Sequence, residues 1–395
     1  MRLAPHHRLY ACFFLFAVAL GALISRMPDL QHSLELTESQ LGLTLIGMAI
    51  GSLISLTLSS PLIAHLGARA TAFITVLGTA ALYALIPWLP NAPLVFTAFF
   101  AAGLLAGALE INLNVEIDRT EAQLGRGIMS RAHGFWSLGF FVTALVASFV
   151  RQLGVSMHVH VGLAFVVVLV VAGLAISGMR NAPVRPSSVE GKAPLVAFPT
   201  LGLASLCIIG IAAFLVEGAG IDWSAIYMRD VFAVSPFVGG LGLSFFTFCM
   251  AVARLFIDPV VDRFGSRAVA TVLLLLSALG LLAVGLAPHP YVALFGFALM
   301  GAGCSAVYPL AVSAAAQRTD RPAQVNVAAL GQVTFIVFFL APPLLGFAAE
   351  YLGIRNSYLI CLPAVALGLV SVKALNGRTV REPAVPATAP TSVHG

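Results

Sequence analysis

Long apolar stretches separated by short polar segments dominate this chain. Alternating segments of about 10 residues, the pattern of a membrane β-barrel, do not stand out. An α-helix needs about 20 apolar residues to cross the hydrocarbon core of a bilayer. The pattern therefore predicts an all-α membrane protein with 12 transmembrane helices, near residues 9–26, 41–60, 70–89, 93–115, 128–150, 157–178, 199–228, 236–257, 268–287, 290–314, 327–348 and 356–374.

Composition and charge agree with this pattern. The chain is 59% hydrophobic and 9% charged, whereas soluble domains have roughly 25% charged residues. If the spans alternate in direction, one side of the membrane receives Arg26, Arg151, Arg229 and Arg355, and the other lysines and arginines fall on the opposite side. This is the positive-inside bias. It predicts that both termini are cytoplasmic and explains the net charge of +5 without a nucleic-acid partner. Because eleven further spans follow, an uncleaved first helix is expected in place of a signal peptide.

The sequence repeats itself weakly. The second span ends in PLIAHLGARA from Pro61, and the eighth ends in PVVDRFGSRA from Pro259, 198 residues later. One residue more aligns RQLGV at 151–155 with EYLGI at 350–354. We therefore predict two pseudo-symmetric six-helix halves, with the N-terminal half at 1–180, a cytoplasmic linker at 181–198, the C-terminal half at 199–375 and a disordered cytoplasmic tail at 376–395.

A charged motif follows the eighth span. Asp262-Arg263-Phe264-Gly265-Ser266-Arg267, with Arg254 and Asp258 upstream, resembles the cytoplasmic loop motif of the major facilitator superfamily, and the resemblance covers nearly the whole chain. It implies two halves that rock about a central site. It also implies a cytoplasmic gate built from Arg254, Asp258, Asp262, Arg263, Gly265 and Arg267; ordinary positive-inside charge is the alternative. The equivalent first-half loop, Ala64 to Arg69, lacks the acid.

Four further stretches resemble a narrower group. ARLFIDPVVDRFGSR, EGAGIDWSAIYMRD, SRMPDLQ and SRAHGFWSLG are similar to the bacterial YbjJ-type subgroup, which is related to fucose/proton symporter-like carriers. Such carriers use an acid in the fourth span, which Glu110 would match. They also use an acid in the first span, which this chain lacks between Tyr10 and Ser25.

Acids inside apolar spans are the first candidates for function, because burying a charge in a membrane is costly. Glu217 lies in the seventh span, and the glycines Gly218 and Gly220 beside it predict a break in that helix. Glu110 shares a helical face with Asn114 in the fourth span. Either acid could bind a proton or solute, or could be permanently paired. Glu116 is expected at the solvated interface, close to Asp118 and Arg119.

Other polar and aromatic residues could line a solute site. His133 and Trp136 open the fifth span, Asp222 and Trp223 follow Glu217, and Tyr308 aligns with Glu110 in the repeat. The alternatives are a structural histidine and, for Trp223 and Tyr227, an aromatic belt at the membrane surface. No histidine has a second ligand at i, i+4, and the five cysteines lie singly in five spans, so no metal site is predicted.

These patterns predict a transporter and not an enzyme. The sequence contains no GxxxxGK[ST], G-x-S-x-G or HExxH motif, and no cofactor is expected. We expect a monomeric secondary carrier of the bacterial inner membrane, whose partners are the lipid bilayer, protons and a small sugar-like or polar solute. The alternatives are a multidrug or metabolite exporter that exchanges protons, and a solute sensor that has lost transport.

Overall fold

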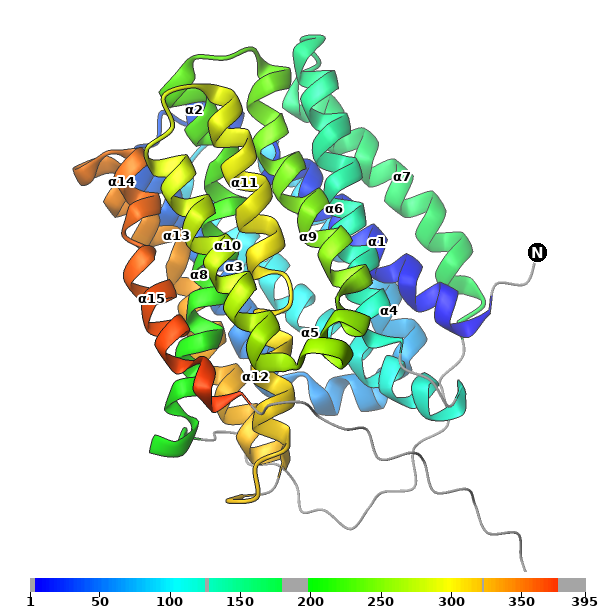
Figure 1. Ribbon diagram of the computed structural model, residues 1–395. Helices are drawn as coiled ribbons and strands as arrows, with labels where there is room; N and C mark the ends of the chain where they lie inside the picture. Colours follow the sequence, from blue (N-terminus) through cyan, green and yellow to red (C-terminus); the bar gives the residue numbers. More distant parts are fainter. Residues whose placement is uncertain (1–3, 125–127, 180–197, 322, 376–395) are drawn as a thin grey trace, which may run out of the picture.

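The computed structural model describes residues 4–124, 128–179, 198–321 and 323–375, and these residues form helices without a strand (Figure 1). The first half contains α1 (Pro5–Ile24), α2 (Met27–Ser33), α3 (Glu38–Leu58), α4 (Ser60–Leu85), a 3-10 turn (Ile86–Trp88), α5 (Ala92–Leu124), α6 (Met129–Gln152) and α7 (Met157–Ser177). The second half contains α8 (Leu201–Phe232), α9 (Pro236–Phe264), α10 (Ser266–Gly285), α11 (Pro290–Cys304), α12 (Val307–Ala316), α13 (Ala323–Leu352), α14 (Ile354–Leu359), α15 (Leu362–Ser371) and a final 3-10 turn (Val372–Ala374).

The predicted spans are confirmed. Within the described ranges, 12 helical segments are long and apolar enough to cross a membrane. The capping box that starts α3 is formed by Thr37 and Gln40, each of whose side chains bonds the other's backbone N–H. At the start of α9, Pro236 takes the first-turn position as expected, but the Ser235 side chain makes no capping hydrogen bond in the described part of the chain. The predicted tail and nearly all of the predicted linker lie outside the described residues.

The internal repeat is visible in the backbone. Gly67 has φ 77° and Gly265 has φ 84°; Gly154 has φ 76° and Gly353 has φ 88°. Each pair consists of residues that align in the sequence repeat. Glycine is the residue that adopts positive φ without a steric penalty, so the chain turns in the same way at equivalent places in the two halves.

Two long helix pairs join the halves: α6 packs along α9, and α3 packs along α13. Figure 1 shows α6 and α9 next to each other near the middle of the bundle. We call the end that holds the starts of α1 and α8 the inner end, which the charge bias predicts to be cytoplasmic, and the opposite end the outer end. Near the outer end the helices approach so closely that a Cβ on Gly42 would meet the Pro342 carbonyl at 2.7 Å.

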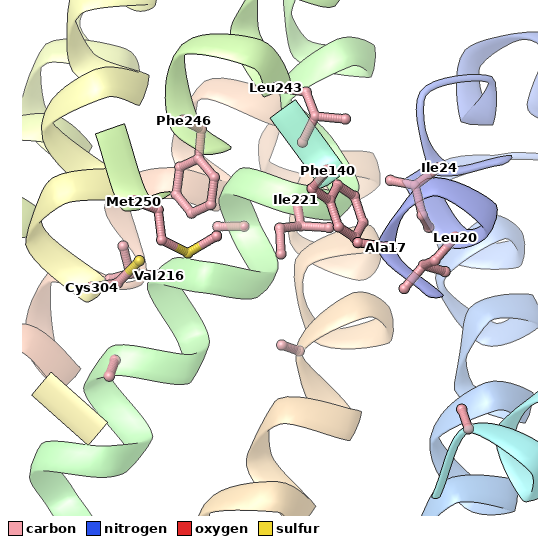
Figure 2. Packing of buried hydrophobic residues seen from close by; sticks show 14 of the residues in the cluster. Ala17, Leu20, Ile24, Phe140, Val216, Ile221, Leu243, Phe246, Met250 and Cys304 are labelled. Carbon is pink, nitrogen blue, oxygen red and sulfur yellow. The ribbon is translucent and has the colours of Figure 1, made fainter. Parts of the chain in front are cut away.

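Helix α8 runs through the core of the second half. Figure 2 shows Val216 and Ile221 of α8 among Phe246 and Met250 of α9 and Cys304 of α11. The predicted break beside Glu217 is wrong, because α8 is one continuous helix. Gly218 and Gly220 serve packing instead. A Cβ on Gly220 would overlap the Phe246 ring, and one on Gly218 would meet Ala341 Cβ at 3.2 Å.

Breaks occur in other spans. The chain leaves the helix inside two spans, between α11 and α12 at Ser305 and Ala306 and between α14 and α15; the turn between α1 and α2 follows the end of the first span at Ile24. In Figure 1, α12 lies below α11 after its break. A break releases backbone carbonyls from intrahelical hydrogen bonds. The Ser305 carbonyl is released in this way near the centre of the bundle, where it becomes available to a side chain.

Candidate functional site

The centre of the bundle holds a buried ion pair. Arg254 Nη2 of α9 lies 3.2 Å from both carboxylate oxygens of Glu217 in α8. The Glu217 side chain is 8% exposed and that of Arg254 is 15% exposed. Arg254 Nε also donates to the Ser305 carbonyl at 3.0 Å, so the break between α11 and α12 supplies one of its acceptors. The pair satisfies an acid and a base that would each be costly to bury alone.

The position of Arg254 differs from the sequence-based expectation. The motif placed it with the charged gate at the cytoplasmic rim, whereas in the structure its guanidinium pairs with Glu217 of α8. The reason is its place two helical turns before Asp262 in α9. Sequence spacing could have indicated this, because an arginine two turns inside an apolar span needs an acid at the same depth.

The ion pair also reaches the other half of the protein. Arg254 Nη1 donates to Ser137 Oγ of α6 at 3.1 Å. One helical turn away on α6, His133 packs against Phe13 of α1, with 4.9 Å between the two ring centroids. The charges of Glu110, Arg254 and Glu217 also act on His133. The structure thus brings His133 and Glu217, both predicted site residues, into one electrostatic group that spans both halves.

Glu110 and Asn114 share one face of α5, as their spacing predicted. Asn114 Nδ2 donates to Glu110 Oε1 at 2.9 Å, and both side chains are half-buried. The charge of Glu110 also acts on Tyr308 of α12, in the opposite half. The acid and the phenol, which align in the repeat, therefore face the same region from opposite halves.

Aromatic side chains form the wall on the second-half side. Tyr308 lies 4.5 Å from Phe214 of α8 and 6.1 Å from Phe335 of α13, measured between ring centroids. Phe214 is one turn from Glu217 along α8. On the first-half side, Trp136 packs on Phe140 at 4.8 Å and stays half-buried. Glu217 therefore lies one helical turn from a cluster of aromatic rings, and a polar group next to apolar ring faces suits an organic solute with both polar and apolar surfaces.

The outer part of α8 does not line this region as predicted. Trp223 is fully buried, so the aromatic-belt alternative is wrong for this residue. The same holds for Tyr227, which is 0% exposed and donates its hydroxyl to the Val284 carbonyl at 2.5 Å. Asp222 is half-buried and lies within the electrostatic reach of Glu217. Of the three, only Asp222 remains a candidate for direct contact with a solute.

Glu116 is also placed differently from the prediction. It was expected at the solvated interface, but it is 2% exposed and pairs with Arg119 at 2.8 Å. The pairing follows from the i, i+3 spacing within α5, whereas the burial depends on how α5 packs and could not be predicted from the sequence. Glu116 is therefore a structural acid in this conformation.

The remaining charges of the predicted gate lie at the inner end of α9 and the start of α10. Asp258, Asp262, Arg263 and Arg267 are exposed. In the part of the chain that the structure describes, no ion pair joins them, and Arg263 lies over the Phe264 ring at 5.3 Å. Gly265 caps α9 with positive φ. These charges are therefore available to pair with other groups when the inner end changes shape.

A second charged cluster, at the outer end, was not predicted. Asp29 of α2 accepts from Arg26 at 2.8 Å and pairs with Arg151 of α6 at 2.7 Å. Arg26 Nη2 also donates to the Val155 carbonyl at 2.5 Å. Burial lowers the pKa of Arg26, and the Asp29 carboxylate opposes that effect. The assignment of Arg26 and Arg151 to one side of the membrane was the only sequence signal for this cluster.

The outer end also carries hydrogen bonds between the halves. Arg229 of α8 donates to the Pro28 carbonyl at 3.0 Å and to Gln31 Oε1 at 2.8 Å. The Ser39 N–H donates to Glu350 Oε2 at 3.1 Å. The Phe237 N–H donates to Gln152 Oε1, also at 3.1 Å. The two halves are therefore tied together at the outer end.

Among the described residues, no group of three or more His, Cys, Asp or Glu side chains is placed to hold a metal ion. All five cysteines are free; four are buried and Cys249 is half-buried.

Comparison with known proteins identifies relatives along nearly the whole chain. The sequence model described as Major Facilitator Superfamily matches residues 206–393. The uncharacterized transporter y4wD of Sinorhizobium fredii is 29% identical over 364 residues, which cover 91% of this chain and 94% of that protein. Among solved structures, a mutant of the nucleoside transporter NupG superposes with a TM-score of 0.72 and 15% identity, covering 94% of this chain and 100% of NupG. A mutant of the Escherichia coli fucose:proton symporter FucP superposes with a TM-score of 0.63 and 20% identity, and the match covers 93% of this chain and 98% of FucP. Both structures share the fold.

Proposed function

We propose that the chain is a membrane transporter of the major facilitator superfamily, and that it is a proton-coupled secondary carrier that moves a small polar organic solute by alternating access. The family model that matches residues 206–393 and the transporter relatives along most of the chain support the family assignment. The observation that carries this proposal is the Glu217–Arg254 pair. It is buried at the centre of the bundle, and Ser137 of the other half bonds the same guanidinium. A proton-binding acid at the contact between the halves can link protonation to their relative movement.

The coupling follows from the cost of burying charge. An ionised Glu217 is stable where Arg254 neutralises it. When the pair separates, a bare carboxylate would be costly in low dielectric, and a proton removes that cost. Proton binding therefore favours the state in which Arg254 is released. Glu110 is the second acid placed for such a role, because Asn114 holds it beside the same region.

The closed outer end fits one state of this cycle. The bonds of Arg229 to Pro28 and Gln31 hold the halves together there, while the charges of Asp262 and Arg267 stay exposed at the inner end. We propose that these inner charges pair with groups of the first half when the inner end closes and the outer bonds break. This assigns them the predicted role of a gate. The carrier would lie in a bacterial inner membrane as a monomer, with both termini cytoplasmic.

Uptake into proteoliposomes tests the proposal. A panel of labelled sugars and nucleosides, the two solute classes for which FucP and NupG are named, is offered with and without an inward proton gradient. We expect accumulation only with the gradient. Glu217→Gln should abolish accumulation but keep exchange of labelled for unlabelled solute, because exchange needs no net proton movement. Asp230→Asn is the control, since Asp230 is an exposed acid of the same helix. Uptake that ignores the gradient and is unchanged in Glu217→Gln and Glu110→Gln would refute proton coupling.

A further inference from the structure

We propose that Arg254 recognises a carboxylate on the transported solute, and that Glu217 holds the place of that carboxylate in the structure described here. The solute class would then be a small polar organic acid. This inference rests on the proposed function, because it names the kind of solute that the central site carries.

The geometry of the ion pair is the first support. Charge-assisted N–H···O hydrogen bonds are typically about 2.7–2.9 Å long, and Asp29 meets that range with Arg26 at 2.8 Å and with Arg151 at 2.7 Å. Glu217 lies 3.2 Å from Arg254 through both oxygens. The central pair is thus held less tightly than the outer cluster of the same protein, so it is better suited to exchange.

The way in which Arg254 uses its donors is the second support. A guanidinium binds a carboxylate best when two nitrogens each donate to one oxygen. Here Nη2 alone contacts both oxygens of Glu217, and Nη1 donates to the Ser137 hydroxyl. The paired donor edge formed by Nη1 and Nη2 is therefore divided between an acid of one half and a hydroxyl of the other. A solute carboxylate placed between the halves could accept from both nitrogens at once.

The surroundings favour a solute that has an anionic end and a polar or apolar body. Glu110 with Asn114 offers polar partners on the first-half side, and Tyr308 with Phe214 offers ring faces on the other. These groups alone would suit a neutral polyol. A neutral solute would leave Arg254 without a counter-charge once Glu217 is protonated, whereas a solute carboxylate would supply one.

This assignment explains how proton and solute could move together. An ionised Glu217 competes with the solute carboxylate for Arg254, and a proton on Glu217 removes the competitor. One proton and one solute anion then enter the site together without changing its net charge. The other titratable groups near the pair are Glu110 on α5, His133 on α6, Asp222 on α8, Asp258 on α9, the Cys304 thiol on α11 and the Tyr308 phenol on α12, whereas the one acid of α13, Glu350, lies at its outer end.

Thermal unfolding of the purified protein in detergent tests the proposal, because a ligand that binds the native state raises its melting temperature. The probes are matched pairs that differ in one carboxylate, such as D-galacturonate with D-galactose, D-glucuronate with D-glucose, and lactate with lactamide, each at millimolar concentration. We expect stabilisation by acids and not by their neutral partners, and we expect it to grow as the pH is lowered, because a proton on Glu217 removes the competing carboxylate.

Three variants assign the effect to the pair. Glu217→Gln should bind the acids with little dependence on pH, because no competing carboxylate remains. The double variant Arg254→Gln/Glu217→Gln, which removes both charges together and so leaves neither one buried alone, should lose stabilisation by acids. Arg318→Gln, at a half-buried arginine of the inner end, should behave like the unaltered protein.

The outcomes separate this inference from the proposed function. Three outcomes would overturn recognition of an anion. These are stabilisation by the neutral compounds, no stabilisation by any compound of the pairs, and equal stabilisation by acids in the double variant and in the unaltered protein. Gradient-driven uptake of a neutral sugar that survives in the double variant would do the same while leaving transport in place. Stabilisation by acids without any gradient-driven accumulation would keep the binding site and overturn proton-coupled transport.

Discussion

A guanidinium in the middle of a membrane bundle is tolerated only where acceptors surround it. Arg254 finds them on three elements: the Glu217 carboxylate of α8, the Ser137 hydroxyl of α6 and the Ser305 carbonyl beside α12. Glycine meets a different demand at the same depth. Because Gly220 has no side chain, the Phe246 ring can lie directly on α8. The position of the helix that carries Glu217 therefore depends on this glycine.

This dependence can be tested by adding one methyl group. Gly220→Ala should lower the free energy of unfolding by about 1–3 kcal/mol, because the Cβ would overlap the Phe246 ring in a packed core. The measurement is the melting temperature of the purified protein in detergent. Gly173→Ala of α7 is the matched control, since nothing lies within 4 Å of its Cβ. Equal melting temperatures for the two variants would contradict the packing role of Gly220.

At the scale of the elements, the interrupted helices position the charged groups. The turn after α1 lets α2 present Asp29 to Arg26 and Arg151, and the break after α11 presents the Ser305 carbonyl to Arg254. The unbroken helix α8 carries the acid itself. Broken and continuous helices therefore have separate roles: the former offer backbone groups and turns, and the latter fixes the depth of Glu217.

The outer cluster should contribute measurably to stability. Asp29→Asn would deprive Arg26, whose side chain is 3% exposed, and Arg151 of their shared acid. Because Asp29 itself is 27% exposed, solvent moderates the loss, and we expect about 1–3 kcal/mol. Asp230→Asn is the control, because Asp230 and its partner Arg229 are both 31% exposed; a change of about 0–1 kcal/mol is expected there. Equal losses by thermal or denaturant unfolding would argue against a structural role for the cluster.

The elements show which features could be predicted from the sequence. Span number and position depend on hydrophobicity summed over about 20 residues, and the repeat depends on glycines whose positive φ no other residue replaces cheaply; both were predictable. The break beside Glu217 was predicted wrongly, because Gly218 and Gly220 can serve either a bend or close packing and only the facing residue decides. The depth of Arg254 in its span could have indicated that it needs an acid. Its partner Glu217 lies 37 positions away in another helix, and no local pattern identifies it.

At the scale of the whole molecule, the halves meet along α6 with α9 and along α3 with α13. The bonds of Arg229, Glu350 and Gln152 close this contact at the outer end. A carrier that alternates between two states has to break these bonds once in each cycle, so they should be individually modest. Because these bonds close the outer end, we expect the outer end to open in the next step of the proposed cycle.

Locking the outer end should stop transport. A Cβ on Gly240 would lie 2.7 Å from Ser148 Cβ, close enough that small shifts of α6 and α9 would accommodate a disulfide. In a background whose five native cysteines are replaced, Ser148→Cys with Gly240→Cys should lose uptake on oxidation and regain it on reduction. The single variant Ser148→Cys should be unaffected by oxidant. Full uptake by the oxidised pair would mean that this end does not need to separate.

The acceptor at Ser305 differs in kind from the others that Arg254 uses. A peptide carbonyl cannot be protonated at any physiological acidity, and it belongs to the same half as the arginine. When Glu217 is neutralised and Ser137 moves away with its half, this oxygen stays behind as a permanent dipole. In the proposed cycle, the break between α11 and α12 would therefore leave Arg254 with one hydrogen-bond acceptor in every state.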